Sequence, residues 1–236
     1  TDQEYLILKE EGWKYSPDIV ILCFLANDFW DNILNFTLRG YGKPKFEIVN
    51  EKLVLKNVPV PIPENFKKKF ALFSFLEAHF YTYSFLENLI YKNKLLNKKR
   101  QIPSWFNYEY IYYKNPPEII KESIEVTGRI LREINMSALK KNVKFIVVYL
   151  PSKEQFSISS KKEINYSLPH LYIQEICHKE NIKFLSLYPL FKKTLGGKKI
   201  EEFYFKDGHF NKKGYLTAGK IIAEFLKKEV FNKRIF

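Results

Sequence analysis

The sequence predicts an α/β fold built on a parallel sheet. Three short runs of aliphatic and β-branched residues have the character of strands, and they occupy residues 17–25 (PDIVILCFL), 143–150 (VKFIVVYL) and 182–187. Such runs are typical of strands that helices cover on both faces, which is the usual situation in parallel sheets. We therefore expect strands to alternate with helices along the chain, and helices to lie on both faces of one sheet.

Helical patterns accompany these strands in the order that a parallel sheet requires. The clearest has a stripe of Ile120, Ile124, Ile130 and Ile134 at helical spacing. The expected helices cover residues 1–13, 116–140, 168–180 and 216–228, with a polar loop or short helix at 190–200. In this arrangement the three strand ends and the turn before the last helix fall on the same edge of the sheet.

Residues 29–115 interrupt the alternation, and we interpret them as an insertion within a single domain of residues 1–236. Residues 45–55 have the pattern of a hairpin, and residues 66–96 carry aromatic side chains at helical spacing. A dense aromatic cluster follows at 105–113. Interleaved aromatic residues and lysines fit a base-stacking platform, a sugar-binding wall, or a lid that packs on itself.

Composition narrows the classes of function. The formal charge of +13 suggests an anionic partner, but the charge comes mostly from lysines spread along helices, and Arg, which suits phosphate recognition, is scarce. We therefore expect no nucleic-acid partner. No window reaches about 18 consecutive apolar residues, so no membrane span is predicted. Cys23 and Cys177 both lie in apolar or helical runs and are expected to be buried, and the scattered histidines predict neither a metal nor another cofactor.

The stretch FYFKDGHFNKKG, residues 203–214, carries the strongest chemical signal. Asp207 and His209 stand two residues apart in a polar, glycine-containing turn just before a helix. In such a pair the carboxylate can fix the imidazole tautomer, and the imidazole can then take a proton from a hydroxyl nucleophile. The alternative interpretation is an ordinary acidic-glycine turn with a histidine at the surface.

A second candidate site follows the strand at 17–25. Asn27 and Asp28 come directly after the apolar run, at the carboxyl end of a strand, where open α/β sheets bind their ligands. The alternative is that they form a plain loop or a helix cap.

Taken together, these motifs resemble the SGNH (GDSL-type) family of esterases and lipases. PDIVILCFLAND, residues 17–28, is similar to the third sequence block of the family, FKDGHFNKKGY to the fifth, and Thr1-Asp2-Gln3 to residues that follow the glycine of the second. The resemblance implies a flavodoxin-like α/β/α sandwich and an ester hydrolase or O-acyltransferase, with a substrate that is an acyl ester, for example on a carbohydrate.

The resemblance also assigns roles to individual residues. His209 would be the general base, Asp207 its orienting carboxylate, and Asn27 a donor to the oxyanion. Asp28 and Asn211, beside these residues, are expected to contact substrate. Leu25 stands where the family has glycine, and Asp207 precedes His209 by two residues rather than three, a variant seen in relatives that act on polysaccharide acyl groups.

The G-D-S block with the nucleophilic serine is missing from the 236 residues. Ser152, after the strand at 143–150, is the nearest substitute, but Pro151-Ser152-Lys153 has the character of a loop end. We expect the chain to begin after the nucleophile strand and a second strand, and to come from a protein of the cell envelope or another extracytoplasmic place. Two further hypotheses remain open, namely a non-catalytic binding module with the same fold and a polyanion-binding protein.

Overall fold

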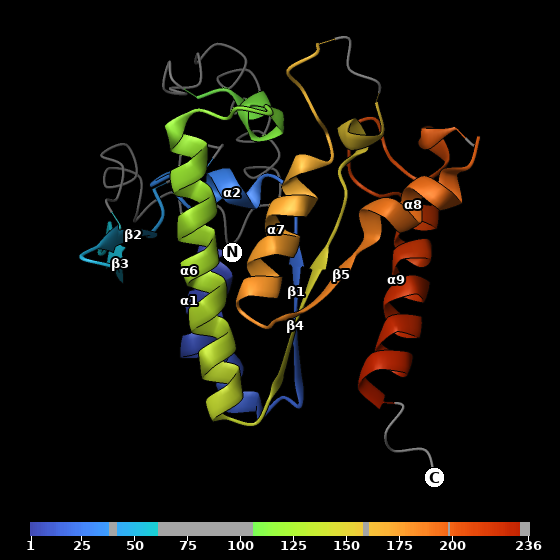
Figure 1. Cartoon of the computed structure of the whole chain (residues 1–236). Helices are drawn as coiled ribbons and strands as arrows, with labels where there is room; N and C mark the ends of the chain where they lie inside the picture. The colour runs from blue at the N-terminus through green and yellow to red at the C-terminus, as the bar shows by residue number, and fades with distance from the viewer. Residues whose placement is uncertain (38–41, 61–105, 158–160, 198, 232–236) are drawn as a thin grey trace, which may run out of the picture.

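The computed structural model describes residues 1–37, 42–60, 106–157, 161–197 and 199–231. It shows a mixed α/β fold in which β1, β4 and β5 form a parallel sheet (Figure 1). The strands are β1 (Ile19–Phe24), β2 (Lys45–Val49), β3 (Lys52–Lys56), β4 (Lys144–Tyr149) and β5 (Lys183–Ser186). The helices are α1 (Asp2–Glu10), α2 (Asp28–Asp31), α6 (Glu118–Lys140), α7 (Leu168–Lys179), α8 (Leu187–Leu195) and α9 (Lys212–Leu226). Short turns of other helix types cover Gly12–Tyr15, Tyr108–Tyr112, Lys153–Phe156, Ile200–Glu202 and Lys227–Phe231.

The three predicted strands pair in the order β1-β4-β5, with β4 in the centre. The register aligns Leu22 with Val147 and Val147 with Phe184. This arrangement confirms the predicted α/β class, the parallel sheet and the position of each strand to within about two residues at its ends.

Alternate side chains of β4 divide the apolar interior in two. Phe145, Val147 and Tyr149 belong to the core beneath α6 and α7, and Ile146 and Val148 belong to the core beneath α8 and α9. This division follows from the two-residue period of a strand. In Figure 1 the helices α1, α6 and α7 accordingly lie on one side of the sheet, and α8 and α9 lie on the other.

The strand β1 departs from the prediction that both of its faces are buried. Leu22 and Phe24 are buried against the α6 side, but Ile21 is 39% exposed and Cys23 is exposed on the opposite face. The prediction of a buried Cys23 was therefore wrong, whereas Cys177 is buried as expected. The reason is positional: β1 pairs with β4 alone among the described strands, so it is an edge strand. On its second face, Ile19 packs against the core beneath α8 and α9, whereas Ile21 and Cys23 are exposed among the described residues.

The described parts of the 29–115 insertion belong to the main core. The hairpin predicted at 45–55 is confirmed as β2 and β3. Phe29, Trp30 and Ile111 are each almost completely buried in the same cluster as β1 and β4. The aromatic helix predicted at 66–96 lies outside the described residues.

A buried polar network ties the first helix to this region. The Asp2 N–H donates to Asn32 Oδ1 at 2.9 Å, and Asn32 Nδ2 donates to the Thr127 hydroxyl of α6 at 2.9 Å. The Lys43 ammonium forms an ion pair with the Asp2 carboxylate, and both side chains are only 3% exposed. Buried polar groups are tolerated when each finds such a partner, so this network specifies how the segments near α2 sit against α1 and α6.

The start of α9 packs directly on the turn at residues 203–211. A Cβ atom built on Gly214 would lie 2.2 Å from the Phe203 carbonyl oxygen and 2.7 Å from Cδ1 of Phe210. Only glycine allows this approach. The contact therefore holds the Asp207-His209 turn against the first turn of the helix.

We predict that Gly214→Ala lowers the free energy of unfolding by about 1–3 kcal/mol, because the added methyl group forces α9 away from the turn. Gly219→Ala is the matched control in the same helix, since a Cβ there meets nothing within 4 Å. Its better helix propensity should stabilise the chain by about 0.5–1 kcal/mol. Urea denaturation of both variants checks the pair, and equal effects would contradict the contact.

Candidate active site

The Asp207-His209 turn is a tight reversal of the backbone. The Phe205 N–H donates to the His209 carbonyl at 2.8 Å, and the Gly208 N–H donates to the Phe205 carbonyl at 3.3 Å. Gly208 has φ of +91°, a conformation that side-chain-bearing residues rarely adopt. The glycine thus brings Asp207 and His209 to the same side of a short loop.

The two side chains contact each other as the sequence predicts. His209 Nδ1 lies 3.2 Å from Asp207 Oδ1, and the same oxygen accepts the His209 backbone N–H at 3.1 Å. This backbone hydrogen bond, followed by the interaction with the imidazole, lowers the pKa of Asp207. The carboxylate is therefore ionised at neutral pH and can hold the Nδ1 proton. The side chains of His209 and Asp207 are 71% and 68% exposed, so the pair is largely open to solvent among the described residues.

Asn27 stands at the start of α2, immediately after β1 ends. Its Nδ2 group donates to Asp31 Oδ2 at 2.9 Å. This bond fixes the orientation of the amide, with its nitrogen toward Asp31. One N–H of Asn27 is used in this bond, and no acceptor for the second is found among the described residues, as an oxyanion donor requires.

Asp28 closes the turn at the end of β1. Its Oδ2 accepts the Leu25 backbone N–H at 2.9 Å. Burial raises the pKa of Asp28 to about 7, and burial likewise raises the pKa of the neighbouring Asp31. Asp28 thus has a clear role in local structure, and its contact with substrate stays a prediction.

Asn211 caps α9. Its Oδ1 accepts the backbone N–H groups of Lys213 and Gly214 at 2.9 and 3.1 Å. Its Nδ2 donates to the carbonyls of Glu202 and Glu201 at 3.0 and 3.3 Å. These bonds satisfy the start of the helix and anchor the preceding turn. The predicted substrate contact of Asn211 stays a prediction, and it would have to share these hydrogen bonds.

The two candidate turns lie on the same edge of the sheet and are connected through the end of β4. The Leu150 N–H donates to the Phe24 carbonyl at 2.8 Å, which joins the ends of β4 and β1. On the other side, the Tyr204 hydroxyl donates to the Pro151 carbonyl at 2.9 Å. Figure 1 shows α2 and the start of α9 at the carboxyl ends of the strands. Within the described part of the chain, no hydrogen bond or ion pair joins Asn27 directly to His209.

Glu154 is a site residue that the sequence did not indicate. A Cβ built on Gly208 would lie 3.1 Å from a Glu154 carboxylate oxygen, so this acidic group stands against the Asp207-His209 turn. Next to it, Lys153 forms an ion pair with Glu201 at 3.4 Å. No sequence pattern indicates this contact, because it depends on how the turn after β4 packs against the turn before α9.

Ser152 has no features of an activated nucleophile among the described residues. Its Oγ is buried, and its backbone N–H donates to Gln155 Oε1 at 3.1 Å in a capping box at the start of the turn. Gln155 also accepts the Tyr149 hydroxyl at 2.7 Å and donates to the Tyr166 carbonyl at 2.7 Å. Ser152 therefore begins a structural turn, as its loop-end context suggested.

The described residues contain no cluster of three or more His, Cys, Asp or Glu side chains placed to hold a metal ion. In the same part of the chain, none of the helices combines the length and the apolar character that crossing a bilayer requires.

Comparison of the chain with family models, with curated proteins and with solved structures found no match in any of the three. The resemblance to SGNH hydrolases therefore rests on the sequence motifs alone.

We predict that Asp28→Asn changes the dependence of stability on pH. The pKa of Asp28 rises from 3.8 to about 7 on folding, so between these values the folded chain holds a proton that the unfolded chain has lost. Stability from this group is therefore greatest below about pH 4 and decreases as the pH rises toward 7. Asn cannot ionise, yet its Oδ1 can still accept the Leu25 N–H.

The wild-type chain should accordingly lose roughly 1–4 kcal/mol relative to Asp28→Asn between pH 4 and pH 8, since one pKa unit corresponds to about 1.4 kcal/mol. Urea midpoints measured across this range test the prediction. Curves of wild type and variant that stay parallel would contradict an elevated pKa at this site.

Proposed function

We propose that residues 1–236 form the greater part of an SGNH-type ester hydrolase or O-acyltransferase. The observation that carries the proposal is the combination of the Asp207-His209 pair with the Asn27 amide on one edge of one parallel sheet. The end of β4 connects their turns through the bonds of Leu150 to Phe24 and of Tyr204 to Pro151. An orienting carboxylate, a base and an oriented amide donor are the parts that acyl transfer requires.

In the proposed reaction, a serine hydroxyl attacks the carbonyl carbon of the ester while His209 Nε2 takes its proton. Asp207 stabilises the resulting imidazolium through Nδ1. The carbonyl oxygen gains negative charge, which the second N–H of Asn27 stabilises. The imidazolium then protonates the departing alcohol, and an acyl-serine remains.

The second half of the reaction repeats these roles. Water attacks the acyl-serine, His209 takes the proton of the water, and the serine leaves with that proton. When the hydroxyl of a second substrate replaces water, the same steps produce acyl transfer. His209, Asp207 and Asn27 therefore have the same roles in hydrolysis and in acyl transfer.

The nucleophilic serine would come from a segment outside residues 1–236. The order β1-β4-β5 with helices on both faces fits a flavodoxin-like α/β/α sandwich whose remaining strands lie beyond β1. Ser152 is a poor substitute because its side chain is buried in a structural turn. Aromatic residues from the described end of the insertion, such as Phe106, whose ring centroid lies 4.7 Å from that of Trp30, suit a substrate with a sugar ring or an acyl chain.

We predict that the protein containing residues 1–236 together with their native flanking sequence hydrolyses p-nitrophenyl acetate. His209→Ala should lower kcat by about 10²- to 10⁴-fold, because the general base is lost. Asn27→Ala should lower kcat by about 10²- to 10³-fold with a smaller effect on KM, because the amide acts on the transition state. His178→Ala, which removes an exposed histidine of α7, is the matched control and should leave the rate unchanged.

The binding-module hypothesis makes the opposite prediction. A flanking sequence without a nucleophilic serine, together with hydrolysis that is unaffected by His209→Ala, would support it and would end the hydrolase proposal.

A further inference from the structure

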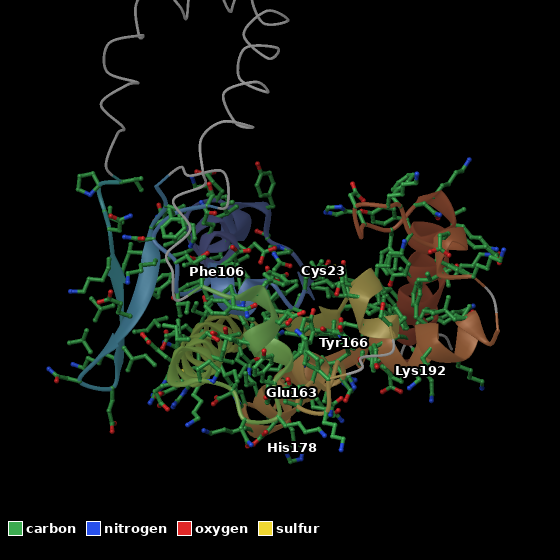
Figure 2. All side chains as sticks on the ribbon, turned by 90° about the horizontal axis from the view of Figure 1, so that it is seen from above. Cys23, Phe106, Glu163, Tyr166, His178 and Lys192 are labelled. Carbon is green, nitrogen blue, oxygen red and sulfur yellow. The ribbon has the colours of Figure 1, made fainter. Side chains whose placement is uncertain are left out.

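The end of the insertion lies beside the candidate active site. The short helical turn Tyr108–Tyr112 is drawn in green in Figure 1, toward the end of the molecule at which the strands of the sheet finish. Just before this turn, the centroid of the Phe106 ring lies 4.7 Å from that of Trp30, which belongs to α2. Figure 2 views this edge from above and shows Phe106 on the side of the blue segments. The turn therefore begins next to the helix that Asn27 precedes.

Hydrogen bonds connect the other end of the same turn to the residues that follow β4. The Asn165 backbone N–H donates to the Tyr112 carbonyl at 2.7 Å. In the same loop, the Tyr166 carbonyl accepts a hydrogen bond from Gln155 Nε2, also at 2.7 Å. Gln155 and Glu154 are neighbours in the turn that follows β4. The end of the insertion thus extends from α2 to the turn that carries Glu154.

Glu154 in turn borders the turn that carries His209. A Cβ atom built on Gly208 would lie 3.1 Å from a carboxylate oxygen of Glu154. The Glu154 side chain is exposed, and the adjacent Lys153 pairs with Glu201 instead. Within the described part of the chain, no lysine or arginine forms an ion pair with Glu154. Its carboxylate is therefore an accessible hydrogen-bond acceptor next to the candidate base.

Tyr108 lies between the two halves of the candidate site. Its side chain is 38% exposed, so solvent reaches it. Burial nevertheless raises the pKa of its phenol well above the ordinary value, and electrostatic interactions with Tyr112, Asp31 and Glu154 raise that pKa further. Asp31 belongs to α2, and Glu154 belongs to the turn after β4. The Tyr108 hydroxyl is accordingly placed between the Asn27 side and the His209 side.

These groups together suit the ring of a sugar. The centroids of the Phe106 and Tyr108 rings are 6.5 Å apart, and they offer an aromatic surface to the C–H face of a sugar ring. Sugar hydroxyls can donate to the Glu154 carboxylate and can exchange hydrogen bonds with the Tyr108 hydroxyl. An acyl chain in the same place would remove water from the carboxylate and return no hydrogen bond, which is costly. The chemistry therefore favours a hydroxyl-rich group over an apolar one.

We propose that Tyr108 and Glu154 determine the specificity of the site, by binding an ester whose alcohol part is a neutral sugar. The sugar ring packs on Tyr108, and its free hydroxyls donate to the Glu154 carboxylate. Neither side chain takes part in making or breaking bonds. The inference rests on the proposed function, and it identifies the part of the substrate that the end of the insertion recognises.

The test uses the protein with its native flanking sequence and two esters. Chemically acetylated cellobiose carries free hydroxyls around its ester groups, whereas p-nitrophenyl acetate has none. Glu154→Ala should raise KM for acetylated cellobiose by about 5- to 20-fold and change kcat by less than about twofold, because the lost hydrogen bond is made in the ground state and in the transition state alike. Tyr108→Phe, which keeps the ring, should raise KM by about two- to fivefold. Neither variant should alter hydrolysis of p-nitrophenyl acetate by more than about twofold.

Two control variants lie away from the end of the insertion. Glu175→Ala removes an exposed carboxylate of α7, and Tyr15→Phe removes the hydroxyl of a side chain that is 81% exposed. Both should leave KM for each ester unchanged. An equal loss of activity of Glu154→Ala on both esters would overturn the proposal, because it would show a structural role. Acetylcholine tests a cationic alcohol, and a larger loss on acetylcholine than on acetylated cellobiose would overturn the proposal as well.

A binding measurement separates this inference from the hydrolase proposal. Saturation-transfer NMR with unmodified cellobiose reports weak binding without any reaction. A cellobiose signal that the double variant Tyr108→Phe, Glu154→Ala loses, in a protein that hydrolyses no ester, would keep the sugar site and contradict the hydrolase. Hydrolysis that depends on His209, with the same KM for acetylated cellobiose in wild type and double variant, would keep the hydrolase and contradict the sugar site.

Discussion

The parallel pairing of β1, β4 and β5 is the constraint on which the rest of the structure depends. Parallel strands end on the same edge, so segments far apart in the sequence are brought there together. Asn27 follows β1, Pro151 follows β4, and the Asp207-His209 turn follows β5 and α8. The bonds from Leu150 to Phe24 and from Tyr204 to Pro151 are local consequences of that common edge.

Much of the fold could be predicted from the sequence because its signal is strong. The strands are continuous apolar runs, and α6 has a long apolar stripe, so their type and approximate bounds were recoverable. The start of the last helix was less accurate: α9 begins at Lys212 rather than at 216, because Asn211 supplies the cap. The exposure of Cys23 was missed for a different reason. An apolar run indicates that a strand needs to be covered on both faces. It does not show whether the element that covers each face belongs to the same stretch of chain.

The candidate site likewise contains contacts that could be predicted from the sequence and one that could not. The contact between Asp207 and His209 was predictable, since two residues flanking one glycine are held together by local geometry. The bond from Asn27 to Asp31 is also local, and the spacing of four residues in ANDFWD is a signal for it. Glu154 was beyond reach, because its approach to Gly208 depends on how two distant loops pack.

The Asp207-His209 pair is open to solvent among the described residues. General bases act best where water is partly excluded, and these side chains are about seven-tenths exposed among the described residues. Under the proposed function, the nucleophile and part of the walls of the site come from sequence outside residues 1–236. The central claim is that His209, Asp207 and Asn27 act together with a serine that residues 1–236 do not contain.

Covalent trapping tests that claim most directly. The protein with its native flanking sequence is treated with a fluorophosphonate, and the modified residue is located by mass spectrometry. The account predicts one adduct, on a serine outside residues 1–236, that is lost when His209 is replaced by Ala. An adduct on Ser152, or no adduct on any serine, would contradict it.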